Sequence, residues 1–143
     1  MLAGVFCLWS PGSLIYSLLV LSSPVSGQCS RTAAEFARHV IARGHSIHRV
    51  FFLDAGTVSG SANSVFPQDE ENPVHYWTAL AEQHTVELVL CISSALKHGM
   101  LDQLEADRYE RPQSTINPPF TISGLGQLID ASANSDRLIT FGG

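Results

Sequence analysis

Short apolar runs alternate with helix-like segments along this chain, and that alternation limits the fold more than any other feature of the sequence. The runs lie at residues 14–21, 47–53 and 86–91. A nearly continuous apolar run is typical of a strand that is covered on both faces of a sheet. Strand, helix and strand within about 40 residues form a βαβ unit. We therefore predict an α/β fold, a three-layer sandwich with a mainly parallel sheet of about five strands.

The segments between the runs carry helix signals. Apolar residues recur at helical spacing in the first of them, at Ala33, Phe36, Ala37, Val40 and Ile41, and Gly44 supplies a stop. Asn72 is a predicted N-cap with Pro73 at the first helical position. Residues 54–71 read as a long acidic loop that shapes a docking surface. Further helices are expected near residues 92–97, 101–109 and 127–133, and a last strand at 137–141.

Size and composition indicate one compact domain. The chain has 143 residues, of which 45% are hydrophobic and 15% charged, which is too apolar for a disordered protein. We assign residues 14–143 to the domain and residues 1–13 to an N-terminal extension, disordered or the product of a misassigned start. The formal net charge of −5 argues against direct binding to a nucleic acid.

The apolar N-terminus imitates a secretion signal over residues 1–27. Three observations argue against that interpretation: no Lys or Arg precedes Arg31, Pro11 and Gly12 would break an apolar helix, and cleavage after Gly27 would remove the first predicted strand. The apolar stretch is also interrupted too often for a membrane span of about 20 residues. We therefore expect a cytoplasmic protein without a membrane segment.

The three cysteines are Cys7, Cys29 and Cys91, and their wide spacing suits neither a disulfide framework nor a paired metal site. Cys91 ends an apolar run just before a helix-like stretch, and a thiol at such a junction gains thiolate character from the helix N-terminus. Ser94 completes a C-x-x-S pattern in which its hydroxyl donates toward the thiolate. The alternative is that Cys91 is a small buried apolar residue, as most free cysteines are.

Other polar groups give weaker signals. The six histidines show no metal-ligand spacing, and Lys97 and His98 are read as an exposed pair at a helix end. The acids Asp54, Asp69, Glu70, Glu71 and Asp102 match no ligand loop and are read as a solvated rim. The glycines of the segment 124–126 lack the rest of a dinucleotide fingerprint. We therefore predict no metal and no organic cofactor.

Several segments together resemble one protein family. They are ARHVIARGH at residues 37–45, VFF at 50–52, WTALAEQHTV at 77–86, LVLCISSALKHG at 88–99 and FTISGLG at 120–126. With these segments the chain resembles the TusD/DsrE family of sulfurtransferases over about residues 15–141, and within it the TusD-type sulfur-relay subunits. The last two segments together are the most specific part of the resemblance.

The resemblance implies a function for Cys91. In that family the matching cysteine accepts sulfur as a persulfide from a TusA-like donor and passes it to a TusE-like acceptor. The resemblance also implies a hetero-oligomer with TusB- and TusC-like subunits, whose sulfur ends in the 2-thiouridine of a tRNA wobble base. It gives no role to Cys7 or Cys29.

Three alternatives stay open from the sequence. The first alternative is a DsrE-like subunit of dissimilatory sulfur oxidation. The second is a non-catalytic scaffold subunit in which Cys91 is only packed. A flavodoxin-like ligand-binding domain is the third alternative, although the sequence lacks a strong phosphate loop.

Overall fold

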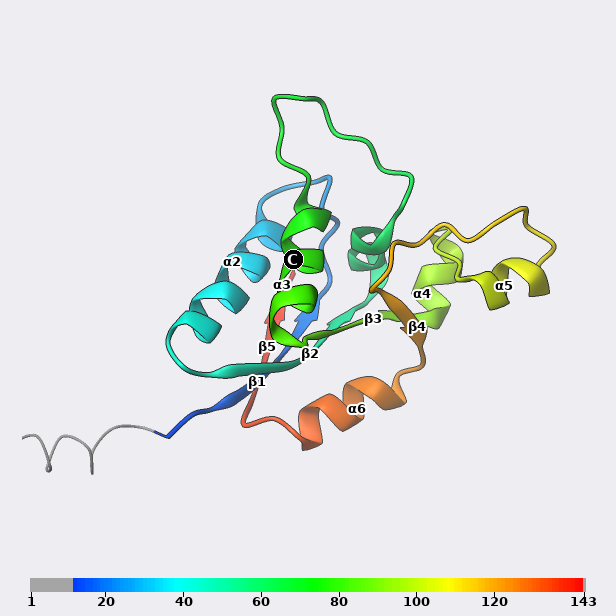
Figure 1. Ribbon diagram of the computed structural model, residues 1–143. Helices are drawn as coiled ribbons and strands as arrows, with labels where there is room; N and C mark the ends of the chain where they lie inside the picture. Colours follow the sequence, from blue (N-terminus) through cyan, green and yellow to red (C-terminus); the bar gives the residue numbers. More distant parts are fainter. Residues whose placement is uncertain (1–11, 143) are drawn as a thin grey trace, which may run out of the picture.

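A computed structural model describes residues 12–142, which form one five-stranded parallel sheet with helices on both faces (Figure 1). The elements in chain order are β1 (Ile15–Val20), α2 (Cys29–Ala42), β2 (Ser46–Phe52), the 3-10 helix η1 (Asp54–Gly60), α3 (Pro73–His84), β3 (Glu87–Cys91), α4 (Ile92–Lys97), α5 (Gln103–Arg108), β4 (Thr121–Ser123), α6 (Gly126–Ala133) and β5 (Arg137–Phe141). The strand order is β4-β3-β2-β1-β5. The predicted α/β sandwich with a parallel sheet is thus confirmed.

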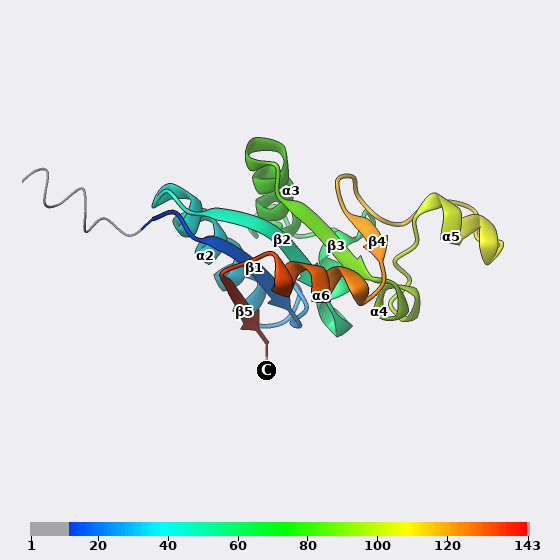
Figure 2. The ribbon, with the colours of Figure 1, turned by 90° about the horizontal axis from the view of Figure 1, so that it is seen from below.

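The two faces of the sheet carry different helices. Helices α2 and α3 lie together on one face, whereas α6 lies alone on the other, as the two views show (Figures 1 and 2). Helices α4 and α5 lie to the side of the sheet, toward its β4 edge (Figure 2). One face is therefore broadly covered and the other only in part.

The main core lies between the sheet and helices α2 and α3. Alternate strand residues point into it because successive side chains of a strand face opposite sides. They are Leu18 and Val20 of β1, Val50 and Phe52 of β2, and Leu88 and Leu90 of β3. Trp77 of α3 is fully buried there and meets Phe52 edge to face, with ring centroids 5.3 Å apart. This face supplies most of the apolar burial.

The α6 face has a smaller core and a buried arginine that is paired with two half-exposed carboxylates. Its buried residues are Phe51, Val89 and Cys91, with Leu19, Leu53 and Leu128 packed at the border. Arg49 of β2 is also buried, and its guanidinium donates to the Glu87 carboxylate at 2.7 Å, the Asp130 carboxylate at 2.8 Å and the Gln127 carbonyl at 2.8 Å. Arg49 therefore ties α6 to strands β2 and β3.

Helix boundaries follow the expected caps. Gly44 follows α2 with φ +88°, a left-handed conformation that favours glycine. The Asn72 side chain accepts a hydrogen bond from the Val74 N–H at 3.0 Å, as predicted for an N-cap. The charged helix expected at residues 101–109 is present as the shorter α5.

The prediction of one irregular loop over residues 54–71 is wrong for its first part. Residues 54–60 form η1, in which Gly56, Thr57, Ser59 and Gly60 are buried. A Cβ at Gly56 would lie 2.2 Å from the Val20 carbonyl oxygen, so only glycine lets η1 approach β1 this closely. The Gly and Ser content that suggested a loop instead reflects close packing at the end of β2.

Two predictions about the N-terminus fall partly outside the described residues. Most of the extension at residues 1–13 and the first part of the signal-like segment at 1–27 are not described, and Cys7 lies in that part. Within residues 12–142, no helix is both long enough and apolar enough to span a membrane.

Candidate functional site

Cys91 lies at the junction predicted from the sequence. It is the last residue of β3 and the N-cap of α4, with φ −62° and ψ 124°. Strand β3 is placed between β2 and β4, and Cys91 pairs with Ser123 of β4. The thiol is therefore held at the carboxyl edge of a parallel sheet, where sites of such folds are found.

The Ser93 hydroxyl lies next to the thiol, with its Oγ 3.4 Å from the Cys91 Sγ. The Ser94 Oγ accepts a hydrogen bond from the Asp54 backbone N–H at 3.0 Å, which joins α4 to η1. The Ser94 side chain also lowers the pKa of Cys91, by less than the Ser93 side chain does. The serine of the C-x-x-S pattern therefore acts on the thiol, and Ser93 is a further hydroxyl that the pattern did not indicate.

The surroundings of Cys91 change its acidity in two opposite ways. Burial raises the pKa of the thiol, because an apolar environment disfavours the charged thiolate. Hydrogen bonds from the Ser93 side chain, the Ser94 backbone, the Ser94 side chain and the Ser93 backbone lower that pKa. The hydrogen bonds outweigh burial, so the pKa of Cys91 lies below its ordinary value. Such a thiol is a better nucleophile near neutral pH.

The thiol is enclosed as well as activated. Cys91 is only 1% exposed, and it shares the small core of the α6 face with Phe51 and Val89. Leu128 of α6 and Leu53, at the end of β2, border this core. A reaction with a second protein therefore requires that the covering side chains move or that the partner displaces them.

The other predicted polar residues lie away from the thiol or have structural partners. His98 is the C-cap of α4, and its Nδ1 lies 2.9 Å from the Ser94 carbonyl oxygen. Asp102 caps α5 by accepting from the Glu105 N–H at 2.8 Å. Glu71 pairs with Arg31 at 3.2 Å. Across residues 12–142, no group of three or more His, Cys, Asp or Glu side chains is arranged to hold a metal ion.

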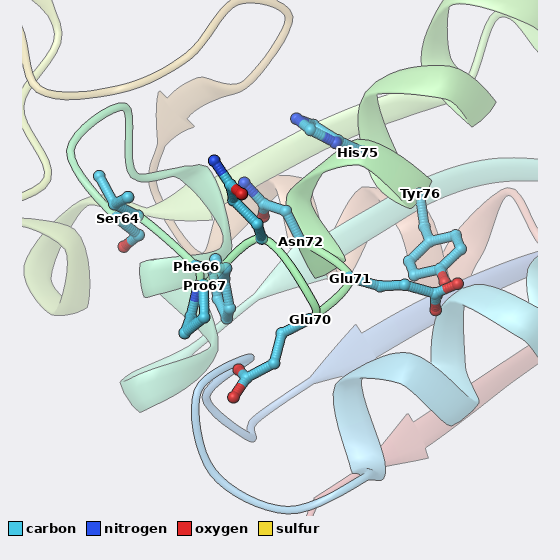
Figure 3. A pocket seen from close by; sticks show the side chains of 10 residues that line it. Ser64, Phe66, Pro67, Glu70, Glu71, Asn72, His75 and Tyr76 are labelled. Carbon is cyan, nitrogen blue, oxygen red and sulfur yellow. The ribbon is translucent and has the colours of Figure 1, made fainter.

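A surface cavity of about 530 Å³ lies beside the loop that precedes α3 (Figure 3). Its lining runs from Ser64 to Tyr76, and the side chains of Glu71 and Tyr76 lie against each other there. The Tyr76 hydroxyl donates to the Glu71 carboxylate, and this hydrogen bond raises the pKa of Tyr76. Cys91 is not among the lining residues, so this cavity is separate from the thiol.

Neither Ser93 nor Arg49 was predicted from the sequence as a functional residue. Ser93 could have been found from its position in the first turn after Cys91, because first-turn residues approach a group at the helix start. Arg49 is a full charge inside a buried apolar strand, and such a charge almost always needs a partner. Its partners Glu87 and Asp130 are distant in sequence and were not predictable from it.

Comparisons with known proteins identify the family of this chain. The model of the DsrE/DsrF-like family matches residues 15–141. The chain is 41% identical to "Sulfurtransferase TusD homolog" of Pseudomonas aeruginosa, over 87% of this chain and 95% of that protein. It is 38% identical to "Putative sulfurtransferase DsrE" of Allochromatium vinosum (89% and 98%), and 36% identical to "Sulfurtransferase TusD" of Serratia proteamaculans (90% and 99%).

A solved structure agrees in fold. The crystal structure of the ychN protein from E. coli superposes with a TM-score of 0.72 at 16% identity, over 91% of this chain and all of that one. This likeness supports the three-layer architecture alone, whereas the sequence relatives support the activity. The chain accordingly belongs to the DsrE/DsrF-like family, and it is a sulfurtransferase.

Proposed function

We propose that Cys91 carries the transferred sulfur as a persulfide. The observation that supports this most strongly is the thiol at the end of β3, whose pKa is held below its ordinary value although the side chain is buried. A purely structural cysteine gains nothing from such a shift. Cys29 is the other described free cysteine, but it lies at the start of α2 without an assigned role.

The proposed exchange conserves atoms and electrons. The Cys91 thiolate attacks the outer sulfur of a donor persulfide, and a new S–S bond forms at Cys91. The S–S bond of the donor breaks, and the donor leaves as a thiolate. The same exchange in the next step moves the outer sulfur to an acceptor thiolate and restores the Cys91 thiolate. The protein needs no metal or organic cofactor for either step.

The proposal also includes a pathway and partners. The donor is a TusA-like protein, the acceptor is TusE-like, and the chain works beside TusB- and TusC-like subunits for 2-thiouridine formation in tRNA. The similarity to relatives named TusD supports this version. A reducing cytoplasm suits a carrier whose thiol has to stay free. The chain itself makes no contact with the tRNA, since its formal net charge is −5.

A second pathway has nearly equal support. The relative named DsrE is 38% identical to this chain, against 41% for a TusD homologue. A DsrE-like subunit of dissimilatory sulfur oxidation would use the same thiol exchange with a different source of sulfur. The two versions therefore share the Cys91 chemistry and differ in the donor.

Sulfur loading tests the carrier role directly. The full chain is incubated with a persulfidated TusA-like donor, and its intact mass and the Cys91 peptide are measured by mass spectrometry. We expect one reducible sulfur on Cys91 in the wild type and in Cys29→Ser, and none in Cys91→Ser. Absence of loading with a competent donor and the partner subunits present would favour the scaffold alternative.

A further inference from the structure

A hydrogen bond joins the two turns that meet beside Cys91. The backbone N–H of Asp54, at the end of β2, donates to the Oγ of Ser94 in α4 at 3.0 Å. From this geometry we infer that Ser94 is a positioning residue, which fixes the first turn of α4 against η1 and so keeps the donors of that turn facing the Cys91 sulfur. The inference rests on the proposed role of Cys91 as the sulfur carrier.

The Asp54 side of this link is rigid. Asp54 has φ +49°, a left-handed conformation that is unusual for a residue other than glycine and persists only where surrounding contacts impose it. Its carbonyl accepts from the Thr57 hydroxyl at 2.8 Å, and Thr57 is fully buried. The preceding residue, Leu53, donates its N–H to the Val20 carbonyl at 3.0 Å. The turn therefore offers Ser94 a fixed donor.

The two serines after Cys91 differ in a way that assigns them different roles. Ser93 is exposed and contacts the sulfur directly, so water can replace its hydroxyl. Ser94 is only 7% exposed, and its oxygen already accepts the Asp54 N–H. Because one lone pair is occupied in this way, the Ser94 hydroxyl hydrogen is free to point away from Asp54 and toward the Cys91 sulfur, so the bond to Asp54 also orients this donor.

Loss of the Ser94 hydroxyl would leave the Asp54 N–H without its partner in a part-buried place. Since an N–H that is partly shielded from water loses stability when its partner is removed, the two turns would shift until water or another group reached it. The shift would move the backbone and side-chain donors of Ser93 and Ser94 relative to the Cys91 sulfur. A positioning role therefore predicts a change in thiol acidity as well as in stability.

The test follows Cys91 in the full chain by alkylation with iodoacetamide between pH 5 and pH 10, read from the peptide that contains Cys91. We expect Ser94→Ala to raise the apparent pKa and to lower the alkylation rate at pH 7 by about three- to tenfold, where tenfold corresponds to one pKa unit. Ser94→Thr keeps the hydroxyl and should restore the wild-type profile. Ser94→Val has the shape of threonine without the hydroxyl and should behave like Ser94→Ala.

Ser59→Ala is the matched control. Ser59 is a fully buried serine in η1 whose hydroxyl has no hydrogen-bond partner among residues 12–142, so its removal should leave the profile of Cys91 unchanged. If Ser94→Ala and Ser94→Val lower the melting temperature but keep the wild-type pKa, Ser94 is merely structural and the inference is overturned. The readout needs no sulfur donor, so sulfur loading on Cys91 can succeed or fail independently of this result. Failure of the inference is thus distinguishable from failure of the proposed function.

Discussion

The two faces of the sheet divide stability and chemistry between them. The face under α2 and α3 holds a broad apolar core that includes Trp77 and Phe52. The face under α6 holds the small cluster of Phe51, Val89 and Cys91. Beside this cluster lies the buried Arg49, which pairs with an aspartate of α6. Strand alternation sends neighbouring residues to opposite faces, so β3 contributes Leu90 to the first face and Cys91 to the second. The reactive thiol thus lies on the face with the smaller core, where fewer packed side chains have to move before a partner can reach it.

Removal of Trp77 from the face under α2 and α3 should give the largest loss of stability. Trp77→Ala should lower the free energy of unfolding by about 3–5 kcal/mol, because it removes a fully buried aromatic side chain and leaves a cavity. Urea unfolding measures the change. His75→Ala, an exposed position in the same helix, should stay within about 0.5 kcal/mol of the wild type. A similarly small loss for Trp77→Ala would refute the view that stability is concentrated on this face.

Removal of the Arg49 ion pairs, which hold α6 on the sheet, should give the next largest loss of stability. Arg49→Met should lower the free energy of unfolding by about 2 kcal/mol at pH 7. The loss is below that of a fully buried pair, because the side chains of Glu87 and Asp130 are 55% and 48% exposed. Arg137→Met removes an exposed arginine from the same sheet and should change stability by less than about 0.5 kcal/mol.

The same pair predicts a dependence on pH. The hydrogen bond from Arg49 holds the pKa of Asp130 below its ordinary value. The contribution of Asp130 to stability is therefore present above about pH 4, the pKa of an unfolded aspartate, and is lost as the pH falls through the lower folded value. The difference between wild type and Arg49→Met should shrink between pH 7 and pH 3. A difference that grows toward acid pH would contradict the assignment.

A smaller loss of stability, with easier access to the Cys91 thiol, is expected when a side chain of α6 is shortened. Leu128→Ala removes a side chain that borders the cluster of Cys91, and it should cost about 1 kcal/mol because Leu128 is only partly buried. The alkylation rate of Cys91 should rise at the same time. Ile129 is the adjacent residue and is 71% exposed, so Ile129→Ala should leave both quantities unchanged. Equal rates in the two variants would mean that α6 does not restrict access to the thiol.

The smallest expected effect is on the acidity of the Cys91 thiol. Ser93→Ala removes a hydroxyl that lies 3.4 Å from the Cys91 sulfur and should raise the pKa of that thiol, since this hydroxyl favours the thiolate. The thiolate fraction at pH 7 should fall by about threefold, or half a pKa unit, with stability nearly unchanged because Ser93 is exposed. The pH profile of alkylation measures the shift. An unaltered profile would remove Ser93 from the site.

Much of the fold could be predicted because its signals are local. Apolar runs marked β1, β2 and β3, and the Asn72 cap with Pro73 marked the start of α3. The segment of η1 could not be predicted, because its conformation depends on the close approach of Gly56 to β1 and on the bond from Asp54 to Ser94. These contacts join residues that are distant in sequence.

The site could be predicted only in its outline. The junction of strand and helix identified the position of Cys91, and the structure agrees with that placement. The positions of hydroxyls around the sulfur depend on rotamers in the first turn of α4, so the pattern C-x-x-S indicated Ser94 and missed Ser93. The enclosure of the thiol depends on α6, which is far along the chain and is held on the sheet by contacts that include Arg49 and Leu128.

The central claim is that Cys91 holds a sulfur atom that it can give away. The most direct measurement loads the full chain with inorganic polysulfide, removes the excess, and adds cyanide, which takes the outer sulfur of a persulfide as thiocyanate. We expect about one thiocyanate per chain from the wild type and from Cys29→Ser, and only background from Cys91→Ser. Equal release from Cys91→Ser and the wild type would contradict it.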